Sequence, residues 1–246
     1  MAKAQPKYRF NPEPRISANQ LAEYVLASPT RRQSILRNAK FSPTFLVIRY
    51  AAAKDAICRY LSDDTRPLNT LINAEVDQIQ LSKAGGTAFQ QNDALLSAEA
   101  IKSFIAARAG FQKALPYATF APNTQSLPKL VKAGVEISIR LDLVARNNGK
   151  GTVGGAILQL SKAVASKSWR EDHSKVVAAL VWLLASDHLT GLGTVDRKLC
   201  MAIDVFGGSA VTAPSNYKRV LNDLEAACGE IAALWPGISP PADYDG

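Results

Sequence analysis

Residues 135–145 read VEISIRLDLVA, and this stretch decides which fold class the chain belongs to. Apolar residues hold every odd position, and the first four even positions are Glu136, Ser138, Arg140 and Asp142. A period of two is typical of a strand with one buried face. The following 147–149, Asn-Asn-Gly, tolerates backbone with positive φ, so we expect a hairpin into a second strand at about 152–161.

Glycine divides the 246-residue chain into two parts. None of the fifteen glycines precedes Gly85, and twelve lie at or beyond Gly134. Glycine supplies the positive-φ turns that hairpins need, and it weakens helices. We therefore predict an α+β fold, with a helical N-terminal half followed by a small β-sheet packed with helices.

Helix start signals recur in the first half. Residues 17–20 (Ser-Ala-Asn-Gln) fit a capping box, and Ser28-Pro29 and Ser42-Pro43 each place a capping residue before a proline. Ser97, with Glu99 after it, suggests a further start. The predicted helices span about 18–27, 29–40, 43–61, 67–82 and 97–109.

The second half continues with a helix at about 173–187, a strand at about 199–206 and a final helix from Ser215 to Leu234. Three prolines between residues 116 and 128 indicate a long connection. The sequence thus predicts a basic helical domain over 1–115, a linker over 116–133 and an α/β domain over 134–246.

Several classes of protein are not expected. The longest apolar run, Val176 to Ala185, is too short to span a bilayer, so we expect no contact with a membrane. No apolar segment follows the charges near the N-terminus, as a secretory signal would require. The three cysteines lack CxxC spacing, which predicts reduced thiols in a cytoplasmic protein without a zinc site.

Positive charge is concentrated near the N-terminus. The net charge is +8, and residues 1–60 hold eleven basic and three acidic side chains. The remaining residues are close to neutral, with eighteen of each kind. A concentrated positive field favours a polyanionic partner, usually nucleic acid and sometimes an anionic lipid surface. The alternative is that these residues merely solvate helices.

The predicted second helix carries a basic cluster that we take as the candidate phosphate-binding site. A trio of helices with a basic middle member could dock on a phosphate backbone, as helix-turn-helix modules do. The candidate contacts are Arg31, Arg32, Arg37, Lys40 and Arg49. Aromatic residues that could stack on single-stranded bases are Tyr24, Phe41, Phe45 and Tyr50, although helical spacing also suits a core.

The element order of residues 135–234 resembles the core of the PD-(D/E)XK, or restriction-endonuclease-like, superfamily. The resemblance implies an Asp on one strand and Glu-x-Lys on the next, with a divalent metal held by the carboxylates. Asp142 matches the Asp. Residues 156–162 read AILQLSK, so Gln159 and Ser161 stand at the second motif, with Lys162 one position later.

That departure leaves two readings of the C-terminal half open. Glu136 shares a strand face with Asp142, so Glu136, Asp142 and Lys162 form the candidate catalytic set of a Mg²⁺-dependent nuclease. An amide is a weaker metal ligand than a carboxylate, however, and Lys162 cannot replace position 161 without a bulge. An ordinary exposed role for Asp142 is the other reading, and it favours a degenerate, non-catalytic module.

A second resemblance covers both halves of the chain loosely. RISANQLAEY at residues 15–24, together with Arg31-Arg32 and Arg49-Tyr50, is similar to a family of uncharacterised bacterial proteins found in mobile-element or antiphage gene neighbourhoods. The resemblance implies a host-defence or element-maintenance setting without specifying a reaction.

Other catalytic motifs are absent from the sequence. It holds no P-loop, no GxSxG and no GxGxxG after a strand. His173 and His188 suit the start and the end of a helix, so we expect no metal site and no cofactor; only the nuclease reading requires Mg²⁺.

The function expected from the sequence is that of a nucleic-acid-binding accessory protein, not an enzyme. The alternatives are the Mg²⁺-dependent nuclease and a protein-interaction subunit of a larger complex. DNA and RNA remain equally open as partners.

Overall fold

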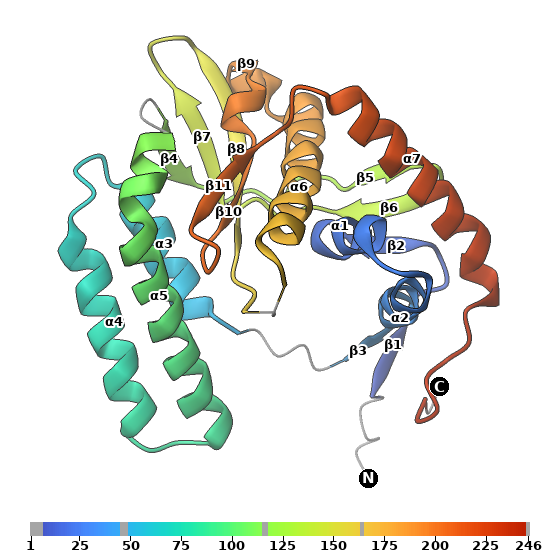
Figure 1. Ribbon diagram of the computed structural model, residues 1–246, viewed down its shortest axis with the longest axis horizontal. Coiled ribbons are helices and arrows are strands. Elements are labelled where there is room, and N and C mark those ends of the chain that lie inside the picture. The colour runs from blue at the N-terminus through green and yellow to red at the C-terminus, as the bar shows by residue number, and fades with distance from the viewer. Residues whose placement is uncertain (1–6, 45–48, 115–117, 163–164, 245–246) are drawn as a thin grey trace. The chain divides into compact units, whose positions relative to one another are not determined.

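A computed structural model describes residues 7–44, 49–114, 118–162 and 165–244 (Figure 1). The chain divides into two compact units. Unit 1 combines residues 1–47, 127–139 and 215–246, and unit 2 combines residues 48–126 and 140–214. Each unit is therefore built from segments that are distant in the sequence.

Unit 1 contains three helices and two small sheets. The helices are α1 (Ala18–Leu26), α2 (Pro29–Lys40) and α7 (Tyr217–Leu234), the last continued by a 3-10 turn, Trp235–Gly237. One sheet pairs β1 (Tyr8–Phe10) with β3 (Phe41–Pro43). The other has the order β2 (Arg15–Ser17), β6 (Val135–Ser138), β5 (Leu130–Lys132).

The core of unit 1 lies where α1 and α7 contact the β2-β6-β5 sheet. Leu21, Ile137 and Ile231 are completely buried. The predicted capping box is confirmed: the Ser17 hydroxyl accepts the Gln20 backbone N–H, and the Gln20 side chain accepts the Ser17 N–H. Two orphan N–H groups of α1 are thereby satisfied.

Unit 2 contains the larger sheet and four helices. The helices are α3 (Ala51–Ser62), α4 (Leu68–Lys83), α5 (Ala88–Ala114) and α6 (Lys167–His188), with short 3-10 turns at Thr190–Leu192 and Arg197–Leu199. The strands are β4 (Thr119–Pro122), β7 (Leu143–Asn147), β8 (Thr152–Gln159), β9 (Thr194–Val195), β10 (Met201–Asp204) and β11 (Ser209–Thr212).

The main path of this sheet has the order β11-β10-β8-β7-β4, and β9 also pairs with β8. β7 and β8 form the predicted antiparallel hairpin, whereas β8 and β10 are parallel and are connected through α6. Leu143, Leu158 and Ile203 face the core formed with α3, α4 and α5. The alternate residues Gln159 and Asp204 contact α6, so helices cover both faces of the sheet (Figure 1).

The prediction of one strand over residues 135–145 is wrong in its continuity. β6 ends at Ser138 and pairs within unit 1, whereas β7 begins at Leu143 and pairs within unit 2. The alternation nevertheless predicted burial correctly, because all six odd positions from Val135 to Ala145 are buried. Burial depends on local periodicity, whereas the sheet that a segment joins depends on distant partners.

Two predicted helix starts are also wrong. Ser42-Pro43 lies in β3, and the third helix begins only at Ala51; Phe45 and Ile48, assigned to its apolar face, lie outside the described residues. Ser97 is buried inside α5. That helix begins after Thr87, whose backbone and hydroxyl exchange hydrogen bonds with Gln90. Thr-x-x-Gln is the same capping pattern, one that the sequence analysis did not use there.

The fold is mixed α and β, and its first half is largely helical as predicted. Strands β1, β2 and β3 also occur within the first 43 residues, so the separation into a helical half and a sheet half holds only in part. The two units differ from the expected boundaries at residues 115 and 134 because β2 pairs with β6, and α7 packs beside them.

Candidate nucleic-acid interface

Four of the five candidate phosphate contacts lie on α2 in unit 1, and Arg49 lies in unit 2. α2 has the predicted bounds, with Pro29 in its first turn. Ile35 and Leu36 are buried and Arg31 and Arg37 are exposed, so one face of the helix packs and the other meets solvent. The four cations of α2 differ sharply in their surroundings.

Lys40 is buried, with 7% of its surface exposed. Its ammonium group donates to the backbone oxygens of Trp235 (2.7 Å), Pro236 (3.3 Å) and Ile238 (3.3 Å). These carbonyls lie at the end of α7, where a helix has orphan acceptors and its dipole favours a cation. Lys40 therefore holds the C-terminal segment against α2 and is not presented to a phosphate.

Arg32 is also occupied by its own unit. Its guanidinium group pairs with Glu230 on α7 (3.1 Å), donates to the backbone oxygen of Tyr24 (3.0 Å) and lies over the Tyr24 ring. Burial, together with the negative charge of Glu230, raises the pKa of Tyr24 to about 12. Arg32 thus joins α2 to α1 and α7, which sequence spacing could not indicate.

Arg31 and Arg37 remain on the solvent face of α2. Arg31 forms an exposed ion pair with Glu23 at 2.7 Å, a kind of contact that contributes little energy and exchanges readily. Arg37 is exposed, and its side chain has no hydrogen-bond or ion-pair partner within residues 7–44, 49–114, 118–162 and 165–244.

The sequence analysis missed the β1–β3 ribbon, which follows directly on α2. In its register Tyr8 faces Pro43, Arg9 faces Ser42 and Phe10 faces Phe41. Arg9 is exposed and, like Arg37, has no side-chain partner among the residues that the structure describes. The alternation of Lys7, Tyr8, Arg9 and Phe10 was the available signal, but three residues are too few for a confident strand.

The other candidate aromatic residues are placed differently. Tyr24 is buried under Arg32, Phe45 lies outside the described residues, and Tyr50 packs edge-on against Phe206 in unit 2. Phe41 belongs to the ribbon, where its ring lies 5.5 Å from that of Phe10. Only Phe41 among the four therefore lies in the same element group as exposed cations.

The three residues of the nuclease hypothesis are each paired separately. Glu136 belongs to unit 1, where it pairs with Lys129 at 2.7 Å and with Arg15 at 3.9 Å. Lys162 belongs to unit 2 and pairs with Glu99 of α5 at 2.6 Å. None of these ion pairs joins one member of the candidate set to another.

Asp142 is not the solvent-facing residue that strand alternation suggested. Its side chain is only 5% exposed, and it pairs with Lys54 of α3 at 2.5 Å. The other carboxylate oxygen accepts the backbone N–H of Leu158 at 2.8 Å. Asp142 therefore fastens the entry of β7 to β8 and α3.

Gln159, which stands at the expected Glu, contacts the opposite helix layer. Its amide oxygen accepts the Ser174 hydroxyl at 2.6 Å, and its amide nitrogen lies 3.0 Å from His173 Nδ1. Both partners belong to α6, whereas the partner of Asp142 belongs to α3. The two motif positions thus address different faces of the sheet.

The second strong ion pair of unit 2 lies at the same sheet edge as Gln159. Asp204 ends β10, and its two carboxylate oxygens accept from Nε and Nη2 of Arg170, with the Nε bond at 2.7 Å. Asp204 is 3% exposed and also accepts the Gly207 N–H. This buried bidentate pair leaves Asp204 committed to Arg170.

These placements do not fit the Mg²⁺ site that the resemblance implies. Magnesium prefers two or more unencumbered oxygen ligands, and both oxygens of Asp142 are taken by protein donors. Within the described part of the chain, no group of three or more His, Cys, Asp or Glu side chains could hold a metal ion. We therefore derive no metal-dependent step for this site.

The three cysteines are free, and Cys200 and Cys228 are buried. Burial raises the pKa of Cys58 and Cys200 to about 12, and that of Cys228 to about 11. Neutral, enclosed thiols are poor nucleophiles, so these cysteines act as small apolar residues.

Two further findings complete the description. Over the described ranges, no helix combines the length and the apolar character that crossing a bilayer requires. No protein-family model and no curated protein matches the sequence.

Proposed function

We propose that the protein binds nucleic acid through phosphate contacts made by exposed cations on α2 and β1 of unit 1. The contacts we assign are Arg37 and Arg9, supported by Arg31. The observation that carries the proposal is that Arg9 and Arg37 are exposed, with no side-chain partner in the described residues. Unpaired guanidinium groups suit phosphate oxygens, which accept their planar donors in pairs.

The two arginines belong to consecutive parts of one substructure. Arg37 is in the last turn of α2, α2 leads directly into β3, and β3 pairs with β1, which carries Arg9. Asn11 reinforces this junction by donating its side-chain amide to the Ala39 backbone oxygen at 2.8 Å. Phosphate contacts of this kind position a nucleic acid without reading its sequence.

The role we propose is that of an accessory, non-catalytic protein. Asp142, Glu136 and Lys162 have separate ion-pair partners, which supports a binding role more than a nuclease reaction. The proposed setting, a bacterial defence or mobile-element system in the cytoplasm, derives only from the sequence resemblance. Arg49 is exposed in unit 2 and remains an additional candidate contact.

The test removes both unpartnered cations while the fold is left intact. In the variant Arg9→Ala/Arg37→Ala, we expect fluorescence anisotropy to show roughly tenfold weaker binding of a labelled 20-nucleotide strand. The slope of log K against log salt should fall by about two, one for each lost phosphate contact. The measurement covers DNA and RNA, since phosphates are common to both.

The matched control is Lys218→Ala/Arg219→Ala, which removes two exposed positive charges from α7 of the same unit. It should weaken binding much less and should leave the salt slope nearly unchanged. Equal losses in the two double variants would mean that only overall charge matters, and the assigned contacts would then be incorrect.

A second candidate function is docking of another protein on the α4–α5 hairpin of unit 2. Large apolar side chains are exposed along these two helices, namely Ile72, Val76, Leu81, Phe89 and Leu95. Exposed apolar groups gathered on one element are typical of interaction surfaces. In that case the protein would copurify with other subunits of a complex at a fixed stoichiometry.

A further inference from the structure

The aromatic face of the β1–β3 ribbon is covered by the end of the chain. We propose that this face is a stacking site for the bases of single-stranded nucleic acid, and that Asp243 and Tyr244 occupy it in the free protein. The inference rests on the proposed function, to which it adds the class of nucleic acid and a means of regulation. All the residues concerned belong to unit 1.

The register of the ribbon places its aromatic rings together. Tyr8 and Phe10 are two residues apart in β1, so they share a face, and Phe41 lies opposite Phe10 in β3. The Phe10 and Phe41 rings are 5.5 Å apart, and Phe10 is 47% exposed. An exposed phenyl ring beside a second aromatic ring is the kind of platform on which unpaired bases stack.

Cations surround this aromatic face. The Lys40 ammonium group lies 5.9 Å from the centre of the Phe10 ring and 5.8 Å from that of Phe41. Lys7 adjoins Tyr8 in the chain, and Arg9 projects from the other face of the same strand. Aromatic rings that alternate with positive charges match the alternation of bases and phosphates along a single strand.

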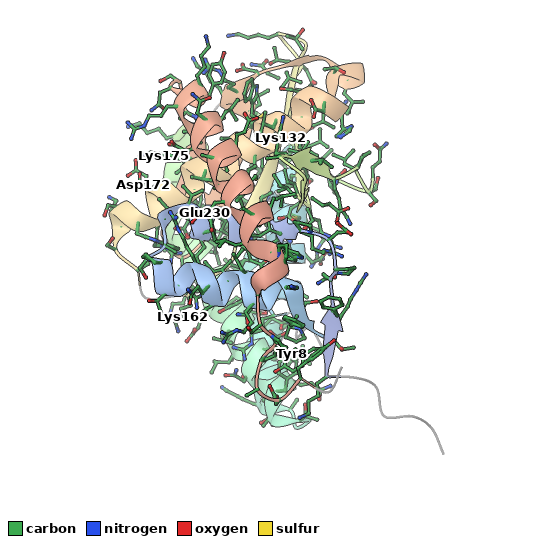
Figure 2. The ribbon with its side chains drawn as sticks, turned by 90° about the vertical axis from the view of Figure 1, so that its right-hand side faces the viewer. Tyr8, Lys132, Lys162, Asp172, Lys175 and Glu230 are labelled. Carbon is green, nitrogen blue, oxygen red and sulfur yellow. The ribbon has the colours of Figure 1, made fainter. Side chains whose placement is uncertain are left out.

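The C-terminal residues bring an acidic group and an aromatic ring to this face. The Tyr244 ring packs edge-on against Phe41 at 4.9 Å and lies 6.3 Å from the Tyr8 ring. Asp243 accepts the Tyr8 hydroxyl at 2.9 Å and lies 3.9 Å from the Lys7 ammonium group. Figure 2 shows Tyr8 beside the segment that follows α7. A carboxylate next to an aromatic ring offers the two chemical features of a nucleotide.

The tail is fixed at its root and only lightly held at its tip. The Trp235 indole donates to the backbone oxygens of Asn11 (3.3 Å) and Pro12 (3.0 Å), and Lys40 binds the carbonyls up to Ile238. Beyond these anchors, the described contacts of Asp243 and Tyr244 are one backbone turn bond and the side-chain contacts with the ribbon. A ligand could therefore displace the tip while α7 stays packed.

The experiment compares the full-length parent with Asp243→Asn/Tyr244→Ala in anisotropy titrations of labelled dT20, U20 and a 20-base-pair duplex. Two lost aromatic contacts and one lost charge should make the variant bind the single strands roughly tenfold more tightly. Duplex binding should change by less than about twofold, because paired bases do not offer their faces. Asp223→Asn, which removes the same charge from α7, is the matched control and should behave as the parent.

A second substitution tests the ribbon itself. Phe10→Ala leaves the tail contacts in place, because the Phe10 ring contacts Phe41 and not Tyr244. In the tail variant this change should weaken binding of the single strands about fivefold or more. Circular dichroism and the unfolding midpoint check that the fold is retained.

Each outcome either supports or overturns the inference. Equal affinity of parent and tail variant, with no effect of Phe10→Ala, overturns the stacking site while the phosphate-binding function stands. No binding of any of the three probes by either protein overturns both proposals. Binding of an acidic peptide with the tail sequence, but of no nucleic acid, by the tail variant would show that the ribbon is a peptide site instead.

Discussion

At the scale of single residues, chemically equivalent cations on one helix have different roles. Lys40 and Arg37 are three residues apart on α2, and both were candidate phosphate contacts. Arg37 is exposed, whereas the Lys40 ammonium group is enclosed by three backbone carbonyls from the end of α7. The difference arises from a segment nearly 200 residues away, so no local pattern could reveal it.

Replacing Lys40 should therefore reduce stability. In Lys40→Met the apolar stem is retained and the ammonium group is lost, leaving three carbonyls without their charged donor. We expect the free energy of unfolding in urea to fall by roughly 1.5–3 kcal/mol, the usual contribution of hydrogen bonds to a charged group. Arg37→Ala is the control on the same helix and should change stability by less than about 0.5 kcal/mol. Similar small losses in both variants would contradict the anchoring role of Lys40.

At the scale of secondary-structure elements, the sheet of unit 2 depends on a close approach of backbone to β8. β8 is the inner strand between β7 and β10. A Cβ atom added at Gly154 would lie 2.4 Å from the carbonyl carbon and oxygen of Leu199. Glycine is required there because the neighbouring chain leaves no room for a side chain.

The corresponding prediction compares two Gly→Ala substitutions. Gly154→Ala must displace the Leu199 backbone and should lower the free energy of unfolding by roughly 1–3 kcal/mol or more. Gly110→Ala lies within helix α5, where an added Cβ meets no atom within 4 Å. It should raise stability by about 0.5–1 kcal/mol, because alanine loses less backbone entropy in a helix. Urea denaturation measures both, and a tolerated Gly154→Ala would refute the close approach.

At the scale of the whole molecule, folding redistributes the charge. The lopsided N-terminal charge suggested one strongly basic domain, yet unit 1 holds twelve basic and eight acidic residues, and unit 2 holds seventeen and thirteen. The C-terminal segment 215–246 brings five acidic and only two basic residues into unit 1. Glu230 and Asp243 of this segment pair with Arg32 and Lys7.

Buried thiols should make stability fall in alkaline solution. The pKa of Cys200 is raised from 9.0 to about 12, and that of Cys228 from 9.0 to about 11. Above pH 9 the unfolded chain therefore loses protons that the folded protein retains, and rising pH favours unfolding. Each of these two thiols should lower the free energy of unfolding by about 1 kcal/mol between pH 8 and pH 10.

The measurement is urea denaturation under reducing conditions at the two pH values. Tyr24 should add to the loss above pH 10, because its pKa is raised from 10.0 to about 12. Cys200→Ala/Cys228→Ala is the control, in which the part of the loss due to the two thiols should disappear. An unchanged pH dependence in this variant would assign the effect to other groups.

The candidate site could be predicted only in part, for a reason that these scales share. The basic character of α2 and the place of Phe41 on its flank follow from the sequence, because a helix and its caps are local. Which α2 cations stay available depends on Glu230 and on the carbonyls after α7, and the ribbon depends on pairing between residues 8–10 and 41–43. Contacts at such separations leave no periodic trace.

Local order alone determined most helices, the 147–151 turn and the buried positions of residues 135–145, because capping, propensity and period-two alternation act over a few residues. The tertiary structure decided that this stretch divides between two sheets, that Asp142 is enclosed by Lys54 and Leu158, and that the C-terminal tail covers the β1–β3 ribbon. Those outcomes depend on which distant groups satisfy a buried carboxylate, an ammonium group or a strand edge, and only the folded chain brings such groups together.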